Sequence, residues 1–308
     1  MSNQFRVVPL DFVFEAVDRI HFPQGKLTNV LRGALGLRLR KQICRADCSD
    51  SRTCPLADPC LYQQLFEGET GSARPSGYNE APRPFVLRSP VWDEIRLLPG
   101  ERMQVSLHLF DPRVEALQEL LRAFGGIGGE GLGPGRARMR LIEIRQPHAE
   151  RVLWLAKIGG RVERPGMMVF QLDPVEDAPV SVRAKFLAPT EIKAQGVVLR
   201  DASFERLFAR LRERLIFLIR HYGGECACDD SVMDAARRIV TVSQRLESVE
   251  LERHSTRTGQ DHPLSGFVGE AHYTGDFSLL WQWLKASEWA GIGRQTVWGK
   301  GAVRWEGV

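Results

Sequence analysis

Four cysteines lie close together in one polar segment, and their spacing is the first pattern that could support chemistry. Cys44, Cys48, Cys54 and Cys60 follow one another as C-x3-C-x5-C-x5-C. In a reducing compartment this density of thiols favours a metal site over disulfide bonds. Four thiolates suit tetrahedral Zn²⁺, and a [4Fe–4S] cluster is the competing occupant. We expect a structural zinc ion here, with an iron–sulfur cluster or no metal as the alternatives.

The stretch GGIGGEGLGPGRARMRL contains a GxGxxG at Gly126, Gly128 and Gly131. This spacing lets a backbone approach the pyrophosphate of a dinucleotide when the glycines follow a strand and open a helix. Here the order is reversed. Apolar residues from Val114 to Phe124 predict a helix before the loop, and alternation after the loop predicts a strand. The pattern therefore argues against a dinucleotide site.

A second loop near the C-terminus repeats this arrangement. The two loops read G-I-G-x4-G-x-G and G-I-G-x5-G-x-G, and each follows a predicted helix and precedes a predicted strand. The repeat indicates a duplicated α+β unit. Glycines allow main-chain N–H groups to approach a phosphate closely, and nearby cations strengthen such contacts. The residues concerned are Gly126, Gly128, Arg136, Arg138 and Arg140 in the first loop and strand, and Gly291, Gly293, Arg294, Gly299, Lys300 and Gly301 in the second.

The elements that position these loops also fall into two halves. Each half approximates the strand-helix-strand-strand-helix-strand order of a ferredoxin-like domain, so we expect an α+β fold with two tandem ferredoxin-like domains, at 1–148 and 149–308. The cysteine segment at about 44–60 forms an insertion in the first. We predict helices at 27–44, 111–125, 204–223 and 277–290, a hairpin turning at Pro99-Gly100, and strands at 4–19, 136–144, 151–159, 167–172, 179–196 and 303–305, with two more within 249–275.

Composition limits the class of protein. The chain has 308 residues, 43% of them hydrophobic, with a net charge of +4. The sequence shows neither a secretory leader nor an apolar run long enough to span a bilayer, so we expect a cytoplasmic protein. The mild basic excess is compatible with a polyanionic partner.

Several segments of the chain resemble those of a known family. The chain is similar to the CRISPR-associated endoribonucleases that cut precursor CRISPR RNA within its repeats, members of the RAMP superfamily of tandem ferredoxin-like proteins. The resemblance implies that the glycine-rich loops contact RNA backbone and that the partner is CRISPR repeat RNA, with a CRISPR effector complex as a candidate second partner. We expect a monomer or a homodimer. The resemblance rests on the segments FPQGKLTNVLRGALGLRLRKQIC, CLYQQLFE, APRPFVL, FLAPTEIKAQG, RHSTRTGQDHPLSGFVGEA and GIGRQTVWGKGAVRW.

Metal-independent cleavage by a ribose 2′-hydroxyl needs a general base, a general acid and cations for the phosphorane charge. His21 lies in RIHFPQGK, between the first predicted strand and helix, where several members of the resembled family carry a catalytic histidine. Lys26 in the same loop is a candidate to stabilise phosphate charge. His254, with Arg257 nearby in RHSTRTG, is the rival site, and the resemblance implies that this segment faces RNA.

Three functions follow from these patterns. The first is an endoribonuclease that needs no cofactor for catalysis and leaves a 2′,3′-cyclic phosphate. The second is a non-catalytic RNA-binding RAMP subunit of a CRISPR effector complex. The third, an iron–sulfur or nucleotide-dependent oxidoreductase, rests only on the cysteines and the GxGxxG.

Overall fold

The chain forms two compact units. Our computed structural model describes residues 3–44, 48, 60–67, 82–111, 113–133, 135–194, 197–223, 226, 230–254, 261–263 and 265–308. One unit comprises Val7–Met168, and the other comprises Met1–Arg6 together with Val169–Val308. We call them the N-terminal and C-terminal units.

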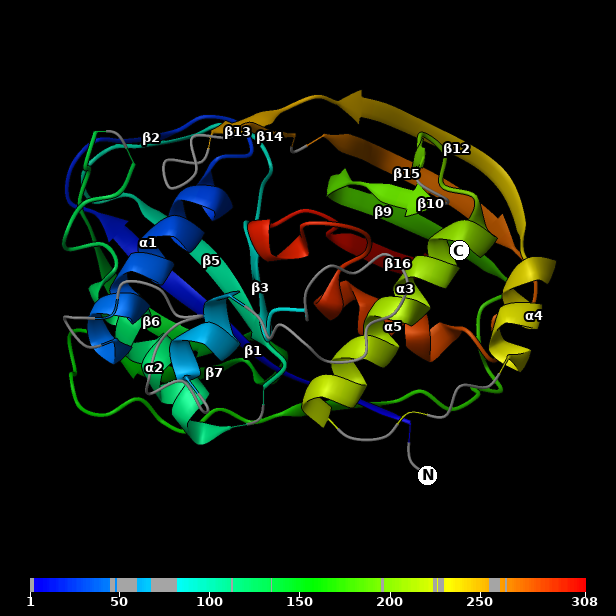
Figure 1. The fold of residues 1–308 in the computed structure, drawn as a ribbon, viewed down its shortest axis with the longest axis horizontal. Helices are drawn as coiled ribbons and strands as arrows, with labels where there is room; N and C mark the ends of the chain where they lie inside the picture. Colours follow the sequence, from blue (N-terminus) through cyan, green and yellow to red (C-terminus); the bar gives the residue numbers. More distant parts are fainter. Residues whose placement is uncertain are drawn as a thin grey trace. The chain divides into compact units, whose positions relative to one another are not determined.

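The N-terminal unit is built on an antiparallel sheet with strand order β3-β5-β1-β6-β7 (Figure 1). Its main elements run β-α-β-β-α-β along the chain, the order of a ferredoxin-like unit. They are β1 (Gln4–Ala16), α1 (Leu27–Ile43), β3 (Phe85–Arg88), β5 (Arg102–Leu109), α2 (Val114–Gly126) and β6 (Met139–Gln146), followed by a 3-10 turn (Pro147–Ala149) and β7 (Arg151–Leu155). A separate two-stranded sheet pairs β2 (Ile20–Phe22) with β4 (Ile95–Leu97), and a π-helical turn covers Gln63–Glu67.

The C-terminal unit repeats the same plan with strand order β12-β15-β9-β16. Two short strands pair as β10 with β11, and two more as β13 with β14, while β8 pairs with the beginning of β1. The elements are β8 (Met168–Gln171), β9 (Ser181–Thr190), β10 (Ile192–Ala194), β11 (Val197–Leu199), α3 (Phe204–Leu218), a π-helical turn (Ile219–Gly223), α4 (Ser231–Arg238), β12 (Val240–Val249), β13 (Glu252–His254), β14 (Asp261–Pro263), β15 (Gly266–Thr274), α5 (Trp281–Ala290), a 3-10 turn (Thr296–Trp298) and β16 (Val303–Gly307).

Aromatic side chains join the helices to the sheet in each unit. In the N-terminal unit, Phe12 of β1 stacks on Phe124 of α2 with ring centroids 4.0 Å apart. In the C-terminal unit, Phe204 of α3 packs edge-on against Tyr273 of β15, at 5.0 Å, and near Trp305 of β16, at 6.3 Å. All five rings are buried. The apolar residues that recur at regular spacing in the sequence therefore face the two cores.

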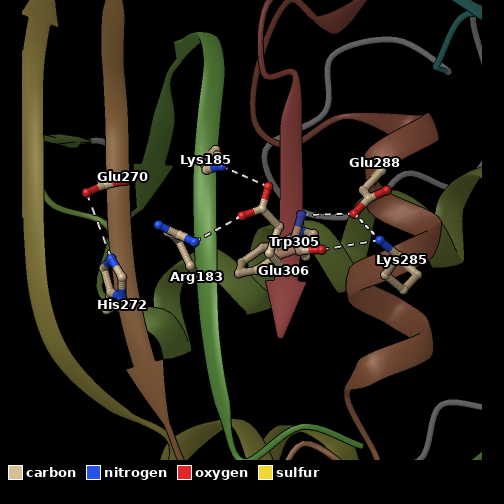
Figure 2. Close-up of polar contacts among 8 residues, drawn as sticks. All are labelled: Arg183, Lys185, Glu270, His272, Lys285, Glu288, Trp305 and Glu306. Carbon is tan, nitrogen blue, oxygen red and sulfur yellow. Dashed lines mark hydrogen bonds and ion pairs between the residues drawn. The ribbon is translucent and has the colours of Figure 1, made fainter. Parts of the chain in front are cut away.

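Polar contacts fix the last strand on both of its sides (Figure 2). The main-chain N–H of Trp305 donates to Glu288 of α5 at 2.9 Å, and Lys285 of α5 donates to the Trp305 carbonyl at 3.2 Å. Across the sheet, Glu306 accepts from Lys185 of β9 at 2.8 Å and pairs with Arg183 at 3.4 Å. The strand that follows the second glycine loop is therefore held by both a helix and its neighbouring strand.

The main helices confirm the sequence predictions at 27–44, 111–125 and 204–223. The helix expected at 277–290 begins later, at Trp281, and the strand expected at 136–144 begins at Met139. The predicted hairpin at Pro99-Gly100 is wrong, because β4 pairs with β2 whereas β5 pairs with β1 and β3. The sequence analysis did not predict α4 or β12. In the part of the chain that the structure describes, no helix is both long and apolar enough to cross a bilayer.

Candidate functional site

His21 lies on β2 and is brought next to a segment that is far away in the sequence. Its Nε2 atom is 2.5 Å from Oε1 of Glu94, and 73 positions separate the two residues along the chain. The side chains are 50% and 45% exposed. An imidazole with this exposure can reach a bound substrate while it keeps its carboxylate partner.

The loop after His21 is fixed to the same segment. The N–H of Gly25 donates to the carbonyl of Trp92 at 2.9 Å, and the amide of Gln24 donates to Asp93 at 3.4 Å. Gly25 has a positive φ of 67°, which glycine adopts without strain. Lys26 then sits directly before the first residue of α1, so the two predicted site residues lie at the two ends of the loop that joins β2 to α1.

Glu94 is held in its ionised form. The Arg96 guanidinium donates to the same Oε1 atom at 2.9 Å. This contact, and then the contact with His21, lowers the pKa of the Glu94 carboxyl below its usual value. The arrangement therefore presents a histidine beside a carboxylate, which is the pairing that orients an imidazole in acid–base chemistry.

In the first glycine loop the glycines let the chain approach itself. A Cβ at Gly128 would lie 2.2 Å from the carbonyl oxygen of Met139, and one at Gly131 would lie 2.2 Å from that of Arg136. A Cβ at Gly126 would meet the guanidinium of Arg38 at 2.6 Å. The loop follows α2 and precedes β6, which is the reverse of a dinucleotide-binding order. Gly128 and Gly131 are needed for close packing of the backbone within the unit, whereas at Gly126 the flexible Arg38 side chain can move aside.

The arginines around the start of β6 have hydrogen-bond and ion-pair partners that the sequence did not predict. Arg138 donates to both carboxylate oxygens of Asp18, at 2.9 and 3.1 Å. Hydrogen bonds from Arg138 lower the pKa of the Asp18 carboxyl to about 2. Arg140 pairs with Glu15 at 2.5 Å. Arg136, in contrast, donates to a main-chain carbonyl, that of Glu130, at 2.9 Å.

The second glycine loop folds back on itself and on the end of β9. The N–H of Ile292 donates to the carbonyl of Gly301 at 2.9 Å, and a Cβ at Gly301 would lie 1.9 Å from the Ile292 oxygen. A Cβ at Gly293 would lie 2.3 Å from the carbonyl oxygen of Glu191. Gly291, Gly293, Gly299 and Gly301 all have positive φ. Their conformation, together with these close approaches, requires glycine.

Lys300 holds this second loop together from inside. Its side chain is 0% exposed, and its Nζ donates to Glu191 at 3.0 Å, to the Ser265 carbonyl at 2.6 Å and to Gln295 at 2.8 Å. Burial lowers the pKa of Lys300, although Glu191 opposes this effect. Arg294, on the surface, donates to the other Glu191 oxygen at 2.7 Å. Lys300 is thus a buried part of the loop, whereas we expected it to be a surface cation.

The rival histidine site is only partly described. His254 lies on β13, which pairs with β14 through a register that places His254 opposite Asp261. Arg257 lies outside the described residues. The structure therefore places the backbone of His254 on a short hairpin.

Three of the four clustered cysteines are described, and Cys54 lies outside the described residues. Cys44 follows α1 directly. Burial, and then the neighbouring thiol of Cys48 and the thiol of Cys60, raise the pKa of Cys44 to about 11, which shows that these three thiols lie near one another. Among the described residues, no group of three or more His, Cys, Asp or Glu has the geometry of a metal site.

Two units of ferredoxin-like order, each containing a glycine-rich loop before its last core strand, define a tandem ferredoxin-like protein. A family model named AF_1859_N, for an N-terminal domain, matches residues 5–165, and the model of the CRISPR-associated endoribonuclease Cas6 matches residues 184–303. Over residues 184–303 the chain belongs to the Cas6 family of CRISPR-associated endoribonucleases, and over residues 5–165 it is of the AF_1859_N type. No curated protein matches the chain.

Solved structures agree with this fold. A product complex of Cas6 (TTHB231) aligns with a TM-score of 0.60 at 16% identity, covering 97% of this chain and 99% of that one. A structure of Thermus thermophilus Cas6 (TTHB231) aligns with a TM-score of 0.53 at 13% identity, covering 97% and 99%. A product complex of Cas6 (TTHA0078) gives 0.52 at 18% identity, covering 98% and 99%. At these identities the matches show the shared fold.

Proposed function

We propose that the protein cuts precursor CRISPR RNA within its repeats, with His21 as the group that moves the proton. The observation that carries this proposal is a half-exposed histidine with a carboxylate partner, on the short strand before the first helix, in a chain that matches an endoribonuclease family. Product and substrate-mimic complexes of Cas6 proteins of the same fold support RNA as the substrate.

The chemistry follows from the residues available. His21 takes the proton from a ribose 2′-hydroxyl, the 2′-oxygen attacks the adjacent phosphorus, and the bond to the 5′-oxygen breaks. The departing 5′-oxygen takes a proton from water. Lys26 supplies positive charge near the phosphate, where negative charge accumulates in the transition state. The products are a 2′,3′-cyclic phosphate and a 5′-hydroxyl, and no metal ion is required for these steps.

The surface cations near the two glycine loops are our candidates for holding the RNA backbone. Arg138, Arg140 and Arg294 are more than half exposed, and a carboxylate partners each of them. A phosphate would compete with these carboxylates for the same guanidinium donors. Arg136 donates to a carbonyl instead, and among the described residues no carboxylate forms an ion pair with it. We therefore assign Arg136 the largest share of backbone binding among the three arginines around β6.

The test is cleavage of the neighbouring CRISPR repeat RNA under single-turnover conditions in EDTA. We expect cutting to persist and to leave a 2′,3′-cyclic phosphate. His21→Ala should retain RNA affinity but lose about 10²-fold or more in rate, the usual scale for acid–base catalysis. His254→Ala is the matched control, because it removes the rival imidazole. A normal rate in His21→Ala with a collapse in His254→Ala would move the site to the C-terminal unit.

An RNA-holding subunit is the second candidate. A partial Cas6-RT-Cas1–Cas2 complex has the same fold over the whole of this chain, with a TM-score of 0.55 at 12% identity, and this chain covers 47% of that one. In this case the protein would bind repeat RNA as part of a larger CRISPR assembly. Tight binding of wild-type protein to repeat RNA without any cutting would favour this function over the endoribonuclease.

A further inference from the structure

We propose that Glu94 is a positioning residue for His21, and that it selects the imidazole tautomer that reacts. This inference rests on the function proposed above. The Glu94 carboxylate accepts a hydrogen bond from the Nε2–H of His21. In the neutral imidazole this leaves the lone pair on Nδ1. Nδ1 is then the atom that takes the 2′-hydroxyl proton.

The pairing of β2 with β4 creates the contact. Ile20, His21 and Phe22 lie opposite Leu97, Arg96 and Ile95, so Glu94 directly precedes the strand that faces the histidine. Ile20 and Phe22 are buried whereas His21 points to the surface. The strand alternation therefore fixes which side chain is presented, and the register brings the carboxylate within 2.5 Å of it.

Glu94 is itself held in place by a second side chain. Arg96 donates to the same oxygen that meets His21, at 2.9 Å. The backbone bond from Gly25 to Trp92 then ties the loop after His21 to the residues before Glu94. A group whose orientation is fixed at both ends can hold an imidazole in one direction.

Both segments also carry other charged groups. They are Arg19 beside β2, Lys26 at the start of α1, and Asp93, Glu94 and Arg96 on and before β4. Glu94 is in direct contact with the ring.

The first experiment needs no cleavage activity. Nitrogen-15 NMR of the histidine side chains in the full chain without RNA, above about pH 8 where imidazole is neutral, reports the tautomer of His21. We expect the Nε2–H form in wild type and a mixture of both tautomers in Glu94→Ala. The matched control is Glu205→Ala, which removes a half-exposed glutamate paired with Arg237 at 3.2 Å in the C-terminal unit, and it should leave His21 unchanged. An Nδ1–H form in wild type would overturn the proposal.

The second experiment is the rate of cutting as a function of pH, at saturating protein and single turnover. Glu94→Ala should lower the rate about 10-fold to 100-fold, the scale seen when the partner of a reactive histidine is removed, with RNA affinity unchanged. Glu94→Gln keeps an acceptor oxygen but not the charge, so it should lose less rate than Glu94→Ala. An unchanged rate and profile in both variants would overturn the proposal.

The two experiments also separate this proposal from the function on which it rests. If His21→Ala cuts normally, His21 is not the catalytic group, and the proposed role of Glu94 fails with it. If His21→Ala is inactive while the wild-type tautomer does not depend on Glu94, the proposed function stands and only the positioning role fails.

Discussion

At the scale of single residues, the buried ammonium of Lys300 makes the strongest energetic demand in the second glycine loop. Its charge is out of contact with water and is balanced by Glu191, which is itself only 6% exposed. Breaking a buried pair by removing one partner leaves the other charge without compensation. Without Lys300, the exposed Arg294, which bonds the other oxygen, would still pair with Glu191. The loop would lose its buried cation and the hydrogen bonds that this cation donates to Ser265 and Gln295.

We predict that Lys300→Ala lowers the free energy of unfolding by about 3 kcal/mol, the lower part of the range for a broken buried pair. Arg294→Ala is the matched control, because Arg294 bonds the other oxygen of Glu191 but is 54% exposed, and exposed pairs contribute less than about 1 kcal/mol. Urea denaturation of both variants measures the difference. Equal effects of the two substitutions would show that burial of the lysine does not carry the stability of the loop.

Residue types and spacing were enough to locate His21 and both glycine loops, since a histidine between a strand and a helix and repeated glycines are visible in one sequence. The partners were not predictable. Asp18 and Arg138 are 120 positions apart, and Glu191 and Lys300 are 109 apart, so no local pattern connects them. The signal that could have found Glu94 was the short apolar alternation at 95–97, which forms the strand opposite His21.

At the scale of elements, the cysteine segment follows α1 and lies between the first helix and the second core strand of the N-terminal unit. We propose that its four thiols hold one zinc ion and thereby close a segment too polar to fold by burial. Cys48 and Cys60 lie near Cys44 in the structure. Among the described residues, these three thiols do not have the geometry of a metal site, so the zinc site rests on the spacing of the four cysteines in the sequence.

We predict that Cys48→Ser and Cys54→Ser lower zinc content and melting temperature together, because metal binding and folding of such a segment are coupled. Cys226→Ala is the matched control. Cys226 is buried in the C-terminal unit, so its loss should change stability without changing metal content. Metal analysis of purified protein and thermal unfolding provide both readouts. Native protein that contains neither zinc nor iron would contradict the assignment.

The elements themselves were predictable to the extent that they are amphipathic. Helices α1, α2 and α3 followed from apolar residues at helical spacing, whereas β12 was missed because most of its residues are exposed, which leaves only a weak alternating signal at a sheet edge. The Pro99-Gly100 turn was identified correctly, but a turn does not specify pairing. The strands on either side of it pair instead with β2 and β1.

At the scale of the whole molecule, the repeated plan does not divide the chain at a single point. The four core strands of the two units come in corresponding order, β3-β5-β1-β6 and β12-β15-β9-β16, but the first six residues group with the C-terminal unit. Leu172 donates to the Asn3 carbonyl at 2.9 Å, and Phe5 lies 6.1 Å from Phe170 between ring centroids. The beginning of β1 therefore belongs to one unit and the remainder of the strand to the other.

This division predicts which elements lose protection from hydrogen exchange when a residue near the N-terminus is mutated. Phe5 is 1% exposed, and truncating a buried phenylalanine costs about 3–5 kcal/mol. Phe5→Ala should therefore increase amide hydrogen exchange in peptides from β8, β9 and α5, more than 150 positions away, and leave β5 and α2 protected. Phe12→Ala, the matched control seven positions later in the same strand, should do the reverse, because Phe12 stacks on Phe124 of α2. Mass spectrometry of exchanged peptides measures both patterns. If Phe5→Ala instead exposed α2 and β5 while β9 stayed protected, the first residues of the chain would belong to the N-terminal unit.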